Sequence, residues 1–179
     1  MSKLTALRPQ DVLVACKIFS LGVSRSEWTF AGLGREVGIS TGEAHNSVER
    51  CRGSGLLGAG GTIVRRALRD LLVVGAPQIF YASRGGISRG MPTSVWAPPL
   101  DGMFELGGAE RLPAVWPLSD DSEDGARGEA VDPIYPSAPE AARDPIVYEL
   151  LALLDVIRIG GPGERKRATG LVERRLIEK

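Results

Sequence analysis

The stretch GREVGISTGEAHNSVERCRGSG, residues 34–55, contains two helical patterns joined by a tight corner. Gly38 ends the first pattern. Ser40 opens the second as S-T-G-E, which predicts a capping box between the Ser40 and Glu43 side chains and each other's backbone N–H. Apolar residues then recur at helical spacing and predict a buried face. The face predicted to point outward is polar and consists of Gly42, His45, Asn46, Glu49, Arg50 and Arg52.

Further helices are predicted on both sides of this stretch. Residues 9–21 begin at a proline suited to the first helical turn and are apolar over most of the circumference, which predicts a core helix. Thr29 can cap a helix over 30–37. Residues 55–64 predict a very short hairpin around glycines, followed by a helix over 65–74.

The rest of the chain has weaker patterns in its middle and helical patterns at its end. Residues 78–83 and 95–100 predict short strands, 84–94 a glycine-rich loop and 119–132 an acidic flexible loop. Ser137 and Glu140 predict another capping box, and helices are predicted over 144–159 and 164–177. The expected fold class is α+β and mostly helical. The expected segments are 1–75, an irregular β-containing middle over 76–135, and a C-terminal helical pair over 136–179.

Composition limits the class of protein. The 179 residues, 43% of them apolar, are enough for one core without disulfides. The 22 basic residues equal the 22 acidic ones, but residues 1–75 hold ten basic and six acidic side chains, whereas 76–135 hold four and nine. The two cysteines have apolar neighbours and no C-x-x-C spacing, which predicts buried thiols in a reducing compartment. With no signal peptide and no apolar run of about 18 residues, we expect a cytoplasmic protein without a membrane span.

The helix, tight turn and polar-faced helix at 29–53 follow the order of a helix-turn-helix. The segment LGREVGIS, residues 33–40, resembles the same segment in bacterial winged helix-turn-helix regulators of the MarR-like kind, and residues 55–64 stand where their wing would be. The resemblance covers about residues 8–75. It implies a winged helix-turn-helix fold, a transcription regulator that binds double-stranded DNA, and a homodimer, for which 136–179 would supply a dimerisation or partner surface.

The resemblance also implies the DNA contacts. The helix over 40–52 would be the recognition helix in the major groove, where Asn46 can pair with adenine and Arg50 with guanine or phosphate. The residues expected to bind DNA are Ser40, Thr41, His45, Asn46, Ser47, Arg50, Arg52, Arg65 and Arg66.

A different class of function stays open. The winged helix can instead be a protein-interaction module, such as the regulatory or antitoxin-like subunit of a complex. The short wing, the zero net charge and the apolar C-terminal helices favour this alternative. Plainer roles also exist, since His45 can be an ordinary solvent-facing residue, and Arg65 and Arg66 a solvated face.

Catalysis is not expected. A Ser-His-Asp or Cys-His site would have to use His45, the single histidine, which lies on an exposed helix face with Cys51 pointing the other way. No metal cluster or nucleotide-binding glycine motif is present, so we expect no metal and no cofactor. The acidic run from Asp120 lacks the glutamate of a calcium loop, because Val131 occupies that position. Arg84 and Arg89 could bind an anion, but a packed loop is the simpler role.

Overall fold

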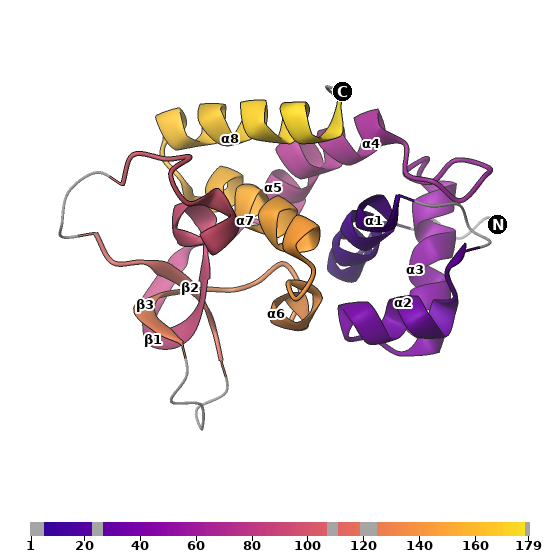
Figure 1. Cartoon of the computed structure of the whole chain (residues 1–179), viewed down its shortest axis with the longest axis horizontal. Coiled ribbons are helices and arrows are strands. Elements are labelled where there is room, and N and C mark those ends of the chain that lie inside the picture. The colour runs from indigo at the N-terminus through magenta and orange to yellow at the C-terminus, as the bar shows by residue number, and fades with distance from the viewer. Residues whose placement is uncertain (1–5, 23–26, 107–110, 119–124, 178–179) are drawn as a thin grey trace.

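The computed structural model of the chain describes residues 6–22, 27–106, 111–118 and 125–177. The fold is α+β and mostly helical, with one small mixed sheet. Figure 1 shows the N-terminal helices at one end, the sheet at the other, and helix α7 between them. The helices are α1 (Pro9–Leu21), α2 (Phe30–Val37), α3 (Thr41–Gly53), α4 (Arg65–Asp70), α5 (Ala76–Ile79), α6 (Ala138–Ala141), α7 (Pro145–Ile159) and α8 (Pro162–Leu176).

The first three helices end where the sequence predicts. Helix α1 stops at Gly22, which has a φ of 63°, and α2 stops at Gly38, which has a φ of 70°. Glycine adopts these left-handed values without the steric cost that other residues meet. Thr29 caps α2 by accepting from the Gly32 N–H at 3.0 Å, and Ser40 caps α3 by accepting from the Glu43 N–H at 3.1 Å. The predicted bounds of α1 to α3 are thus confirmed to within one residue.

The segment after α3 differs from its prediction. The expected hairpin over 55–64 is reduced to one isolated antiparallel bridge between Leu57 and Ile63. The expected helix over 65–74 is α4 followed by a π-helical turn, Leu71–Gly75, and by α5. The strand predicted over 78–83 is wrong, because the helical path continues to Ile79 and the Phe80 N–H bonds to the Ala76 carbonyl at 2.8 Å.

The sheet consists of β1 (Arg84–Thr93), β2 (Ala114–Pro117) and β3 (Ala126–Val131). Strand β1 is antiparallel to both others, and β2 and β3 are parallel. The loops predicted over 84–94 and, in part, over 119–132 are therefore strands. A Cβ atom at Gly90 would overlap the Trp116 carbonyl oxygen, and one at Gly128 the Pro113 carbonyl oxygen. These glycines let the backbones of neighbouring segments approach closely, and do not mark flexible loops as the sequence predicted.

Two other predictions in this half of the chain are corrected. Residues 95–100 form no strand but belong to two 3-10 turns, η3 (Ser94–Trp96) and η4 (Pro98–Leu100), as expected for a segment with consecutive prolines. The Ser137 hydroxyl does not cap α6. It donates instead to the Val37 carbonyl at 2.6 Å, because α6 packs against the end of α2.

Helix α7 is the centre of one hydrophobic core that includes residues from Val12 to Leu176. All of its residues from Leu150 to Arg158 are buried, and it contacts α1, α5, α8 and the η3 turn. The apolar stripe of α7 is therefore covered by the chain's own elements, and the prediction that residues 136–179 supply a dimerisation or partner surface stays a prediction. No helix within the described ranges is both long and apolar enough to cross a membrane.

A buried polar cluster fixes α7 to the sheet. The Asp155 carboxylate accepts hydrogen bonds from Thr93 at 2.7 Å, from the Trp116 indole at 2.6 Å and from Arg158 at 2.7 Å. The Tyr148 hydroxyl donates to the Pro92 carbonyl at 2.5 Å, and burial raises the pKa of Tyr148 to about 12. The sheet is thus held as part of the same rigid core as the helices.

Candidate nucleic-acid interface

The outward face of α3 is a continuous row of exposed residues. Positions i, i+3, i+4 and i+7 of a helix lie on the same side, and the exposed side chains follow that spacing from the first turn to the last. Their exposure means that none of the described segments covers this face. The row consists of Thr41, Gly42, His45, Asn46, Glu49 and Arg52.

Arg50 does not belong to this row, and the prediction that it points outward is wrong. Its side chain is only 8% exposed and turns toward α1. Its guanidinium donates from Nε to Asp11 Oδ2 and from Nη2 to Asp11 Oδ1, both at 2.8 Å, and from Nη2 to Glu43 Oε1 at 2.6 Å. Asp11 is fully buried and needs these donors, so Arg50 is held inside the protein.

Ser47 is likewise inside rather than at the surface. It is fully buried, and its hydroxyl donates to Asp11 Oδ1 at 2.6 Å. The predicted DNA contacts of Ser47 and Arg50 are therefore both corrected to structural contacts between α1 and α3.

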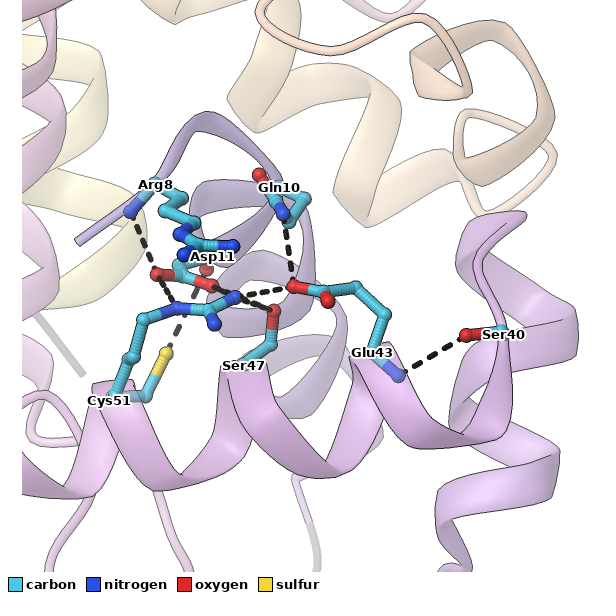
Figure 2. A network of polar contacts seen from close by, with 8 residues as sticks. Arg8, Gln10, Asp11, Ser40, Glu43, Ser47 and Cys51 are labelled. Atoms are coloured by element: carbon cyan, nitrogen blue, oxygen red, sulfur yellow. Dashed lines mark hydrogen bonds and ion pairs between the residues drawn. The ribbon is translucent and has the colours of Figure 1, made fainter.

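Figure 2 shows these groups as one network around the Asp11 carboxylate, which also accepts from the Arg8 backbone N–H at 2.7 Å. The Glu43 carboxylate is directed at Arg50 and at the Gln10 amide, 2.9 Å away, rather than back at the Ser40 N–H, so only half of the predicted capping box forms. The hydrogen bond from Arg50 lowers the pKa of Glu43, and the one to Asp11 raises that of Arg50. The network fixes the rotation of α3 about its own axis.

His45 is exposed but is held in place by an aromatic neighbour. Its ring meets the Phe30 ring edge-on with the centroids 4.9 Å apart, and Phe30 meets Trp28 in the same way at 5.9 Å. Trp28 is buried, so this contact anchors the middle of the exposed row to the start of α2. His45 thus presents its imidazole from a defined position.

The two ends of the row differ in charge. Ser40 and Thr41 lie exposed at the N-terminus of α3, where backbone N–H groups carry partial positive charge. At the other end, exposed Arg52 forms an ion pair with Glu49. The outer face of α3 is therefore polar and nearly neutral.

Arg65 and Arg66 lie apart from this row. The Arg65 guanidinium lies over the Phe19 ring, 5.4 Å from its centroid, and donates to the Leu176 carbonyl at 3.4 Å. Arg66 borders a shallow hollow together with Glu173 of α8. The structure thus places these two predicted DNA contacts beside α8.

The corner between α2 and α3 is braced by the C-terminal part of the chain. A Cβ atom at Gly38 would overlap Glu140 Oε2 and would lie 2.7 Å from the Ser137 Cβ. Lys17 of α1 bridges Glu36 of α2 and Asp144, the N-cap of α7. These contacts tie the corner to the core. The sequence patterns did not predict them.

Other candidate groups are structural. Arg84 pairs with Glu129 and lies over the Trp96 ring, whereas Arg89 is exposed and donates to the Gly125 carbonyl, so the structure does not bring the two arginines to one anion site. Burial raises the pKa of the Cys51 thiol to about 12, which disfavours a reactive thiolate. The described residues contain no cluster of three or more metal-ligating side chains.

Comparison with known proteins finds no match to this chain among family models, curated proteins or solved structures. The geometry of the described residues is therefore the basis for assigning a role to α3.

Proposed function

We propose that the chain is a winged helix-turn-helix protein that binds double-stranded DNA as a transcription regulator, with α3 in the major groove. The observation that carries the proposal is the uncovered row on α3, on a helix whose opposite side is fixed to α1 by the Asp11 network. A helix that enters a groove must keep its rotation and must expose polar groups to the base edges. The α3 helix meets both conditions.

The residues of the row have distinct roles in this proposal. The Asn46 amide has the donor and the acceptor that pair with adenine N6 and N7. His45, one residue earlier, contacts a neighbouring base edge. Ser40 and Thr41 at the helix N-terminus, and Arg52 at its end, contact the phosphates on either side of the groove.

The size of the row fits the groove. Arg52 lies eleven positions after Thr41, which corresponds to about 16 Å along the helix at about 1.5 Å per residue. The major groove is about 12 Å wide and admits one helix. A twofold dimer would place two such helices about one DNA turn apart, and α7 would not form its interface, because it is buried.

The test is selection of bound duplexes from a random-sequence library, followed by affinity measurement with the selected site. Asn46→Ala should weaken binding by about 5- to 150-fold, the equivalent of about 1–3 kcal/mol for one bidentate base contact, and should relax the preference at one adenine. Gln78→Ala removes an exposed amide from α5 and serves as the matched control. Failure to enrich any sequence, or equal binding by both variants, would contradict the proposal.

A protein-interaction module is the second candidate, favoured by a specific observation. Of the two arginines of α3, Arg50 is turned inward onto Asp11 and Arg52 is already paired with Glu49. A polar, nearly neutral helix face also suits a protein partner. Protection of Thr41–Arg52 from hydrogen exchange by a stoichiometric protein partner, with no change on adding duplex, would favour this candidate.

A further inference from the structure

Helices α4 and α8 lie side by side and carry an excess of positive charge. They contact each other directly, and Figure 1 shows α8 along one edge of the molecule with α4 beside its C-terminal half. Residues 162–176 contain five basic and two acidic side chains, and residues 65–70 contain three and one. The basic members are Arg65, Arg66, Arg69, Arg165, Lys166, Arg167, Arg174 and Arg175.

Only some of these cations are neutralised by neighbours. Arg69 pairs with Asp70 and Glu173, and Arg175 pairs with Glu149 at 3.3 Å. Arg66, Lys166 and Arg174 are exposed and have no carboxylate within 4 Å among the residues that the structure describes. The charge at these three positions is therefore available to a ligand.

Two shallow hollows lie on this surface. One hollow of about 390 Å³ lies between the two helices, bordered by Arg66 and Glu173. A second, of about 600 Å³, runs along α8 past Lys166, Glu173 and Arg174. Glu173 borders both hollows. In the second, a Cβ atom added at Gly163 or Gly170 would meet no described atom within 4 Å, so a ligand can approach the α8 backbone closely there.

We propose that this α4–α8 surface binds the sugar–phosphate backbone of a nucleic-acid duplex without reading its sequence. Its ligand must be a polyanion, since the cations are spread over two helices rather than focused on one point. Arginine suits phosphate because its planar fork donates two parallel hydrogen bonds. The exposed residues of α8 are Pro162, Gly163 and cations, Ile177 just after its end is an exposed apolar side chain at the first hollow, and no aromatic side chain borders either hollow among the described residues, whereas protein interfaces are enriched in aromatic anchors.

This proposal goes beyond the role of α3. Figure 1 shows α3 at one end of the molecule and α8 along a different edge, so the row on α3 and the α4–α8 surface consist of different helices and make their contacts independently. Sequence preference is assigned to α3, and salt-dependent affinity for any duplex is assigned to α4–α8.

The test measures the affinity of the full chain for a mixed-sequence DNA duplex over a range of salt concentrations. The variant Arg66→Gln/Lys166→Gln/Arg174→Gln removes three cations that make no ion pair in the described part of the chain. Each phosphate contact adds about 0.9 to the slope of log K against log salt, so the variant should lower the magnitude of that slope by about 2 to 3. The matched control Arg89→Gln/Arg127→Gln/Arg143→Gln removes the same charge from exposed positions elsewhere and should leave the slope unchanged.

Two outcomes would overturn the proposal. Equal slopes for the two triple variants would mean that only net charge matters. Displacement of the duplex by polyglutamate as efficiently as by unlabelled duplex of equal charge would assign the surface to an acidic polypeptide. The selection of a preferred site for α3 and the salt titration of the mixed-sequence duplex use different ligands and different variants, so failure of α3 and failure of the α4–α8 surface are separate results.

Discussion

The Arg50 guanidinium donates two hydrogen bonds of 2.8 Å to the Asp11 carboxylate, and the Asp11 side chain is fully buried. This pair joins the first turn of α1 to the third turn of α3. A buried carboxylate has lost its hydrogen bonds to water, and the hydrogen bonds from its protein partners replace them. The pair sets which side of α3 faces solvent.

Loss of Arg50 should be strongly destabilising. Arg50→Ala leaves the Asp11 charge buried with fewer donors, and we expect the free energy of unfolding to fall by about 3–5 kcal/mol. Urea unfolding followed by circular dichroism measures the change. Arg52→Ala, two residues later and exposed, should cost less than about 1 kcal/mol. Equal losses for the two variants would contradict the assignment of Arg50 to the core.

Gly38→Ala tests the brace on the corner between α2 and α3. A left-handed alanine costs about 1–2 kcal/mol, and the new Cβ also overlaps Glu140, so the loss should exceed that of Gly22→Ala. At Gly22 the backbone is similarly left-handed, but among the described residues a Cβ would approach its nearest neighbour only to 4.0 Å. Thermal unfolding of both variants isolates the packing effect. Glu140→Ala should partly restore stability to Gly38→Ala and not to Gly22→Ala.

Gly42→Ala should separate stability from binding. Gly42 lies in the first turn of α3, where a Cβ meets nothing within 4 Å, so alanine should stabilise the protein by about 0.5–1 kcal/mol. If α3 lies against DNA as proposed, the added methyl group should weaken binding to the selected site while the melting temperature rises. Higher stability with unchanged affinity would mean that Gly42 does not face the bases.

Asp144 should make stability depend on pH in the acid range. Burial acts to raise the pKa of Asp144, but hydrogen bonds from Lys17, Ser20 and the Ile146 N–H outweigh it, and the pKa is lowered. The stability that the charged form contributes is therefore present above its ordinary pKa of about 3.9 and is lost as pH falls through the lowered value. Asp144→Asn keeps a capping oxygen without the charge.

The measurement is the difference in unfolding free energy between the wild type and Asp144→Asn from pH 7 down to pH 2. It should be constant above about pH 5 and shrink below about pH 4. A difference that stays constant down to pH 2 would mean that the Asp144 charge adds no stability.

Thr93→Val tests the cluster that joins α7 to the sheet. The Thr93 hydroxyl donates to the buried Asp155 carboxylate at 2.7 Å, and valine has nearly the same shape without the donor. The loss should be about 1–3 kcal/mol, measured by urea unfolding. Thr62→Val, at an exposed position, should change stability by less than about 0.5 kcal/mol. No loss for Thr93→Val would show that Trp116 and Arg158 satisfy Asp155 without it.

Local patterns predicted α1, α2, α3 and α7 because their caps and stop residues act within a few positions of the chain. Ser40 binds an N–H three residues away, and Gly38 ends α2 through its own backbone angle. The middle of the chain was predicted poorly for the opposite reason. The glycines of β1 are typical of loops when the local sequence is considered alone. They belong to a strand because β1 pairs with β2, more than twenty residues away, and Gly90 lies close to the Trp116 carbonyl there.

The sequence by itself determined where the helices of residues 9–53 begin and end, and which residues line the outer row of α3, except that Arg50 leaves the row and Thr41 joins it. Tertiary structure alone decided that Arg50 and Ser47 point inward, that Arg65 and Arg66 join α8, and that α7 is buried. The physical reason is the distance along the chain over which each interaction acts. Capping and periodicity depend on neighbours in the chain, whereas the direction of a long polar side chain depends on where its charged partner lies in space, and Asp11 is thirty-nine residues from Arg50.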